Sequence, residues 1–165
     1  MNKLTAPEAK ILLSKTFLQE PLPPIPADAD LFHDTIYDFR GFKNKLWSEL
    51  TFQDIEESWG FCSGKYHVDD KYYLYYLPGL LLATFDVPDS YPLALHALLP
   101  HSNNFRINTQ WKELIEKLND GQMNTLIEFF TKCKTDFVHA KIMETDILID
   151  LLRGSIVERM GRQIK

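Results

Sequence analysis

The segment from Tyr72 to Phe85 constrains the fold of this chain more than any other part of the sequence. Its 14 residues include no ionised side chain. Drawn as a helix, it shows apolar or aromatic side chains on every side, and such a helix is stable only inside a protein core or a membrane. A membrane-spanning helix needs about 20 apolar residues, and Lys71 and Asp86 close this segment at its two ends. We therefore expect a helix at the centre of a protein core.

Pro78 lies in the middle of this segment and is followed by Gly79. Proline has no backbone N–H to donate to the carbonyl of Leu74, and its ring crowds that turn, at a cost of about 3 kcal/mol when nothing relieves it. Glycine in a helix interior adds a smaller cost. The pair predicts a kink or a break in the central helix.

The rest of the sequence predicts short amphipathic helices separated by turn signals, with no sustained strand-like alternation. Thr5-Ala6-Pro7-Glu8 has the form of a capping box at the start of a first helix. Further helices are expected near residues 28–40, 51–59, 90–99, 109–118, 123–133 and 136–152, the last ending at Gly154. Asn119-Asp120-Gly121 is expected to break the helical pattern. The fold class is all-α, with about seven or eight helices packed around a central kinked helix.

The length of 165 residues fits a single globular domain spanning 1–165. Within it, residues 20–27 form a proline-rich linker after the first helix, and residues 136–165 form a C-terminal helical extension. The N-terminal residues lack the uninterrupted apolar stretch of a signal peptide. Cys62 and Cys133 lie far apart and lack metal-binding spacing. We expect a cytoplasmic protein with reduced thiols and no membrane association.

The net charge of −5 disfavours nucleic acid as a partner, because phosphate backbones are bound by clustered Lys and Arg. The one basic cluster lies at the C-terminus, and we interpret it as a solvated helix end. Its members are Arg153, Arg159, Arg162 and Lys165.

The cleanest amphipathic pattern lies in residues 28–40, where Asp30, Asp34 and Asp38 share one helix face and Tyr37 flanks them. Like charges four residues apart destabilise a helix by about 0.2–0.5 kcal/mol per pair. This acidic stripe is either a solvated face or a docking surface for a basic protein partner.

An aromatic pocket beside Pro78 is the alternative site. Apolar pockets with a few converging polar groups are typical ligand sites, whereas aromatic side chains in such a segment also fit a packed core. The residues that would line this pocket are Tyr72, Tyr73, Tyr76 and His96.

No motif in the sequence indicates catalysis, a metal or a cofactor. His96 and His101 are five residues apart and diverge by about 140° on a helix, unlike a zinc-binding i, i+4 pair. The glycines are scattered singly, so no phosphate-binding loop is indicated, and no nucleophile elbow is present.

The run from Tyr72 to Leu81 resembles the signature of a bacterial family of unknown function, Tyr-Phe/Tyr-Leu-Pro-Ala/Gly-x-Leu. That family also has a Trp-x-x-Leu element, here Trp47 to Leu50, about 25 residues earlier. A late Leu-x-x-x-Gln-x-x-x-Leu-x-x-Phe element matches Leu118, Gln122, Leu126 and Phe129. The resemblance covers about residues 11–137, with Gly79 where Ala is commoner. It implies a common fold and no activity.

Two functions follow from these patterns. The preferred one is a non-enzymatic protein-binding module, such as an acidic immunity-type protein that neutralises a partner toxin. The alternative is a small-molecule binder or enzyme with an aromatic pocket beside Pro78.

Overall fold

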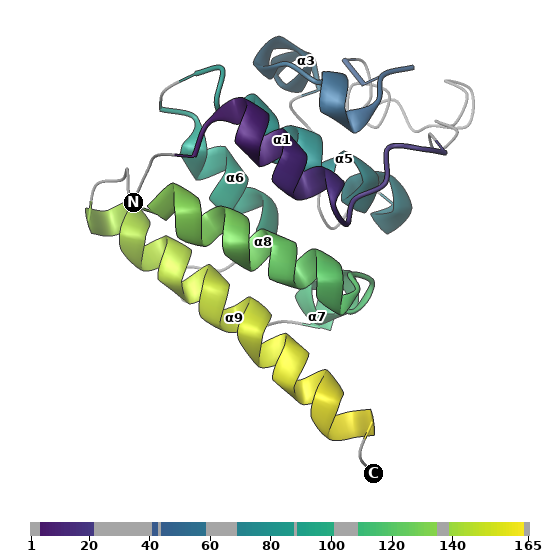
Figure 1. The fold of residues 1–165 in the computed structure, drawn as a ribbon, viewed down its shortest axis with the longest axis vertical. Coiled ribbons are helices and arrows are strands. Elements are labelled where there is room, and N and C mark those ends of the chain that lie inside the picture. Colours follow the sequence, from purple (N-terminus) through teal and green to yellow (C-terminus); the bar gives the residue numbers. More distant parts are fainter. Residues whose placement is uncertain are drawn as a thin grey trace. The chain divides into compact units, whose positions relative to one another are not determined.

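The computed structural model describes residues 4–21, 41–42, 44–58, 69–87, 89–100, 109–134 and 139–163. Within these ranges every regular element is a helix, which confirms the all-α fold class (Figure 1). The predicted helix at residues 28–40, with its acidic stripe, lies outside the described residues. The chain divides into two compact units: unit 1 comprises Met1–Thr16 and Leu98–Lys165, and unit 2 comprises Phe17–Ala97. The single-domain organisation stays a prediction.

Unit 2 is organised around α5, Asp70–Ala83, which is the predicted central helix. The Asp69 side chain accepts a hydrogen bond from the Lys71 amide at 3.0 Å and caps the N-terminus. The helix continues through Pro78 without interruption, so the break offered as one outcome of this proline does not occur. Pro78 and its helix neighbours are buried, and this packing holds the turn in place despite the missing N–H.

The helix α5 packs closely on η2, a 3₁₀ turn at Trp47–Glu49, and on α3, Phe52–Glu57. A Cβ atom added at Gly79 would lie 2.5 Å from the carbonyl oxygen of Trp47 and 2.7 Å from Cδ1 of Leu50. Only glycine therefore permits this approach. The indole of Trp47 is fully buried and donates to the carbonyl of Leu18 at 3.1 Å, so η2 also fixes the chain that enters unit 2.

Helix α6, Tyr91–Leu98, closes unit 2, and Leu98 is assigned to unit 1. The predicted helix start at Ser90 is confirmed, because the first residue of α6 is Tyr91. The Ser90 hydroxyl donates to the carbonyl of Thr84 at 3.0 Å and to that of Val87 at 2.7 Å. Ser90 thus ties the start of α6 to the turn that follows α5.

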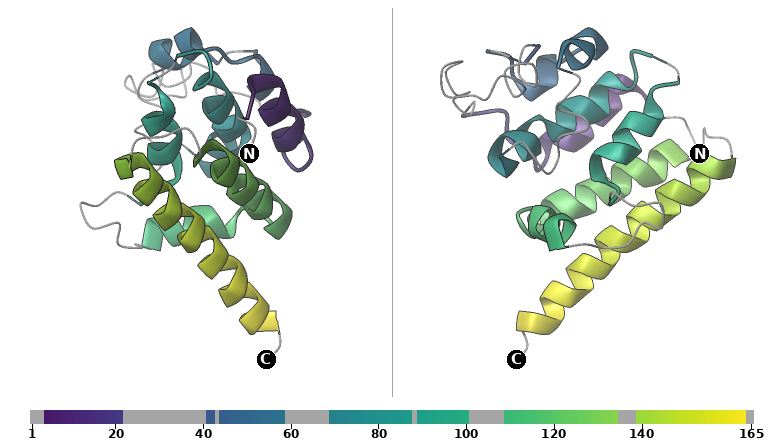
Figure 2. Two further views of the ribbon diagram at one scale, coloured as in Figure 1. Left: turned by 60° about the vertical axis from the view of Figure 1, so that its left-hand side comes forward. Right: turned by 180° about the vertical axis from the view of Figure 1, so that it is seen from behind.

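Unit 1 combines α1, Ala6–Ser14, with three later helices. These are α7, Thr109–Glu116; α8, Asp120–Cys133; and α9, His139–Gln163. Helices α8 and α9 run side by side as an antiparallel pair, α1 packs on α8, and α7 packs on α9 (Figures 1 and 2). Figure 2 shows the end of α9 extending past α7 and α8.

The predicted helix start at Thr5 is confirmed by a capping hydrogen bond, whereas α8 begins at Asp120, earlier than the predicted residue 123. The Thr5 amide donates to Oε2 of Glu8 at 2.9 Å, which is half of the predicted capping box. Asn119 caps α8 through the Gln122 amide at 2.8 Å. Asn119-Asp120-Gly121 therefore separates α7 from α8 as expected, but Asp120 and Gly121 belong to the first turn of α8.

The predicted end of the last helix at Gly154 is wrong, because α9 continues to Gln163. Glycine ends a helix when the following residues gain nothing from continuing it. Here Arg159, beyond the glycine, donates to the carbonyls of Ile115 and Leu118 and holds the extra turns against α7. The side chain of Arg159 is only 18% exposed, so the interpretation of the basic cluster as a solvated helix end fails for this residue.

We predict that Gly79→Ala destabilises the protein by about 1–3 kcal/mol, because the added methyl group overlaps backbone that cannot move aside easily. Urea denaturation followed by circular dichroism measures this loss. Gly154→Ala is the matched control, because its added Cβ would meet no atom within 4 Å. It should stabilise α9 by about 0.5–1 kcal/mol. Equal effects of the two substitutions would contradict the close approach at Gly79.

Candidate functional site

The tyrosines of the predicted aromatic pocket lie in the interior of unit 2. Tyr72, Tyr73 and Tyr76 are buried, whereas His96 is exposed. The hydroxyl of Tyr73 donates to the carbonyl of Ala97 at 2.8 Å. Its position and bonding match those of a packed core residue. All three tyrosines are therefore buried, whereas the histidine lies at the surface, and the pocket beside Pro78 stays a prediction.

Tyr76 joins α5 to the chain that follows the acidic stripe. Its hydroxyl donates to the carbonyl of Phe42 at 3.2 Å, and the two rings pack with centroids 4.9 Å apart. Burial raises the pKa of Tyr76 well above its ordinary value, and the neighbouring Tyr75 raises it further. The phenol is therefore neutral at physiological pH, which suits a structural hydrogen bond and not acid–base catalysis.

The residues directly after the predicted acidic stripe are fixed firmly in unit 2. The amide of Gly41 donates to Oγ of Ser58 at 2.7 Å, and Phe42 is fully buried. A Cβ atom at Gly41 would lie 2.2 Å from the carbonyl oxygen of Asp54. Residues 28–40 are thus joined at their C-terminal end to an anchor on α3 and α5.

Asp54 is the buried carboxylate of this anchor, with a side chain only 8% exposed. Its Oδ1 accepts a hydrogen bond from Nζ of Lys45 at 2.6 Å, and Oδ2 accepts from the amide and hydroxyl of Thr51 at 2.9 Å each. Burial raises the pKa of Asp54, but these hydrogen bonds outweigh it and hold the pKa below the usual 3.8. The carboxylate is therefore charged and fully used in the fold.

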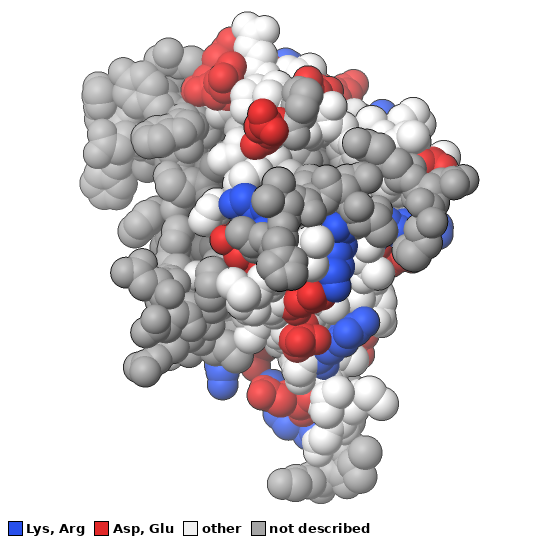
Figure 3. Space-filling model, turned by 90° about the vertical axis from the view of Figure 1, so that its left-hand side faces the viewer, with Lys and Arg blue, Asp and Glu red and all other residues white. Residues whose placement is uncertain are grey.

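Most other acidic side chains of unit 2 are exposed. Unit 2 contains 13 Asp and Glu residues against 5 Lys and Arg, a net charge of −8. Unit 1 contains 10 acidic and 13 basic residues, a net charge of +3. Figure 3 shows acidic groups gathered near its upper edge with few basic ones among them. The acidity of the chain is therefore a property of unit 2. Its exposed members in the described ranges are Glu20, Glu49, Glu56, Glu57, Asp69, Asp86 and Asp89.

A groove of about 290 Å³, which no sequence pattern indicates, lies between α7 and α9 in unit 1. Its floor includes the buried Trp111 and Ile115, and its walls combine three basic with three acidic residues. Nη1 of Arg162 lies 2.9 Å from Oε1 of Glu116, and the two side chains form an ion pair across the groove. Balanced charge and engaged arginines leave no excess of either sign to bind an ion. The basic side chains are Lys112, Arg159 and Arg162, and the acidic ones are Glu116, Asp150 and Glu158.

Neither a metal centre nor a disulfide is found in the part of the chain that the structure describes. No group of three His, Cys, Asp or Glu side chains there could hold a metal ion. Cys133 is a buried free thiol. No described helix is long and apolar enough to cross a membrane.

We predict that Asp54 makes the stability of the protein acid-sensitive. Because its pKa is lower in the folded than in the unfolded chain, its contribution is present above the unfolded pKa and is lost as pH falls from about 5 toward 2. Asp54→Asn should be less stable than the native protein at pH 7 and should lose less stability on acidification. Urea denaturation at several pH values measures this. Glu56→Gln, an exposed carboxylate on the same helix, should keep the native pH dependence.

We also predict that Tyr73→Phe lowers the free energy of unfolding by about 1–2 kcal/mol, because it leaves the buried carbonyl of Ala97 without this donor. Thermal and urea denaturation measure the loss. A variant of unchanged stability would contradict a structural role for the hydroxyl and would favour the predicted pocket.

Comparison with known proteins places this chain in a family without an assigned activity. A model of the family of unknown function DUF6714 matches residues 32–146. This range begins later than the predicted resemblance at 11–137 and extends into α9. No curated protein and no solved structure matches the chain. Because the match covers more than half of the sequence, the chain belongs to the family of unknown function DUF6714.

Proposed function

We propose that this protein is a non-enzymatic binding module that engages a basic protein through the acidic surface of unit 2. Its role would be that of an immunity-type protein that neutralises a partner toxin in the bacterial cytoplasm. The docking surface would be the acidic stripe of Asp30, Asp34 and Asp38, with Tyr37 as an aromatic contact beside it.

The uneven distribution of charge carries this proposal. The net charge of unit 2 is −8, although the whole chain carries only −5, because unit 1 is basic. If the charged residues were distributed evenly, both units would carry a net negative charge. A concentrated negative field attracts a basic partner at long range, speeds association and fixes its orientation.

The anchor that follows the stripe along the chain supports the same proposal. The segment of residues 28–40 is followed by Gly41 and Phe42, which are held by Ser58 and Tyr76. The buried carboxylate of Asp54 is paired with Lys45 within this anchor. The buried negative charge of Asp54 is thus neutralised by Lys45. The exposed acidic residues of unit 2 are the ones that this proposal assigns to a partner.

The aromatic side chain at Tyr37 fits the chemistry of such an interface. Tyrosine is enriched at the energetic centres of protein interfaces, where a ring packs and its hydroxyl finds a hydrogen-bond partner. Charges around such a centre contribute mainly to rate and specificity. In this proposal Tyr37 supplies contact energy and the three aspartates select a basic partner.

We predict that replacing Asp30, Asp34 and Asp38 together with Asn abolishes capture of a basic protein from a lysate of the native host. Bound proteins are identified by mass spectrometry, and the affinity of a purified partner is then measured by calorimetry at increasing salt. The native complex should weaken steeply with salt, because screening shortens the range of the field to about 8 Å at physiological ionic strength.

The matched control removes the same number of negative charges from unit 1. Glu113→Gln, Glu116→Gln and Glu158→Gln change exposed side chains of α7 and α9. This triple variant should keep the native affinity. The proposal fails when no basic protein is captured, or when the two triple variants bind the partner equally well.

A further inference from the structure

We propose that the groove between α7 and α9 binds a small zwitterionic molecule with an apolar body, such as a free amino acid or a dipeptide with a large apolar side chain. Every described residue that lines the groove belongs to unit 1. The proposal therefore does not depend on the proposed function of unit 2.

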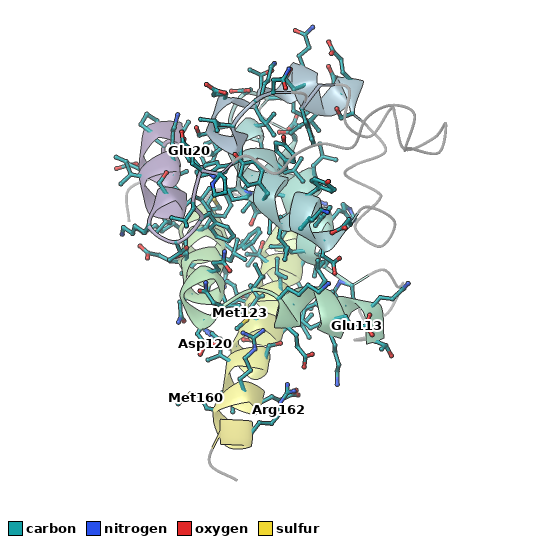
Figure 4. All side chains as sticks on the ribbon, turned by 90° about the vertical axis from the view of Figure 1, so that its right-hand side faces the viewer. Glu20, Glu113, Asp120, Met123, Met160 and Arg162 are labelled. Carbon is teal, nitrogen blue, oxygen red and sulfur yellow. The ribbon has the colours of Figure 1, made fainter. Side chains whose placement is uncertain are left out.

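The groove lies between two helices that are fixed to each other near one end. Arg159 of α9 donates to the carbonyls of Ile115 and Leu118, at the end of α7. The guanidinium of Arg162 forms an ion pair with Glu116 of α7. Figure 4 shows Arg162 on the side of α9 from which α7 extends. These contacts hold the two walls in place, so the groove is formed by the fold itself, as most small-molecule sites are.

The floor of the groove is apolar, and its size suits a small ligand. Trp111 and Ile115 of α7 are buried, and Leu151 of α9 is half-buried. The indole of Trp111 donates to the carbonyl of Leu98 at 2.7 Å, so its polar group is used within unit 1 and its ring is left for apolar contact. The volume of about 290 Å³ is close to the lower limit of about 300 Å³ for ligand pockets.

Two charged side chains of the walls are not used by the fold. Both arginines are engaged by α7 and the chain just after it, and Asp150 pairs with Arg153 of its own helix at 3.7 Å. Within the described part of the chain, no hydrogen bond or ion pair engages Lys112 or Glu158. Lys112 belongs to α7 and Glu158 to α9. The groove therefore offers a ligand one cation and one anion, from different helices.

These two charges determine the kind of ligand. An uncharged apolar molecule in the groove would displace water from Lys112 and Glu158 and leave both charges without a partner, which is unfavourable. An anion or a cation would satisfy only one of the two. A zwitterion offers a carboxylate to Lys112 and an ammonium group to Glu158, and charge-assisted hydrogen bonds of this kind are stronger than neutral ones.

Gly154 provides room for the ligand. It is one of the residues of α9 that line the groove, and an added Cβ would meet no atom of the described residues within 4 Å. Glycine disfavours the interior of a helix, and, unlike Gly79, Gly154 is not required by a close backbone contact. Space for a ligand supplies a reason for this glycine. Gly161 has equally open surroundings but is not among the described residues that line the groove.

An NMR titration of the isotope-labelled full chain tests the proposal. Two probes are zwitterions, L-phenylalanine and glycyl-L-phenylalanine, and two carry one charge on the same ring, phenylethylamine and phenylpropanoate. At least one zwitterion should shift the indole N–H resonance of Trp111, and both single-charge probes should bind about tenfold more weakly than it. Lys112→Gln and Glu158→Gln should each weaken binding of the zwitterion by about tenfold, because each removes one charge-assisted hydrogen bond.

Leucine substitutions at the two open glycines are a matched pair. Gly154→Leu should abolish binding, because the new side chain occupies the groove, whereas Gly161→Leu should leave it unchanged. Circular dichroism checks that both variants keep the native helix content. The proposal is overturned when neither zwitterion shifts the Trp111 resonance, when a single-charge probe binds as tightly as the zwitterions, or when the two leucine variants behave alike.

Discussion

The contact between α5 and η2 is the constraint on which unit 2 depends. A helix without a polar face has to be covered on all sides, and α5 meets that demand because Gly79 lets the backbone of Trp47 approach it directly. The same turn holds the entering chain through the Trp47 indole. Coverage of α5 in turn buries Pro78, so tertiary packing stabilises a helix that local propensity would interrupt. Gly79 and Pro78 both disfavour a helix, and one packing arrangement thus explains why α5 contains both.

Helix starts could be predicted from the sequence much better than helix ends. Thr5 and Thr51 precede α1 and α3 as the cap signals indicate, because a cap is a local interaction between residues three apart. The end of α9 could not be predicted in this way. It depends on Arg159, which donates to the carbonyl of Ile115 in α7 and to that of Leu118 just after α7, both more than 40 residues earlier in the chain. A long-range contact of this kind overrides the local stop signal at Gly154.

The candidate site could be predicted only in part, for a similar reason. The spacing of Asp30, Asp34 and Asp38 predicts an acidic helix face from sequence alone. These three residues lie outside the described residues, so the face stays a prediction. The different net charges of the two units could not be predicted without the topology. Unit 1 combines the two ends of the chain and so contains basic residues that are distant in sequence. The exposure of His96, which sequence reasoning grouped with the tyrosines, also follows from tertiary packing.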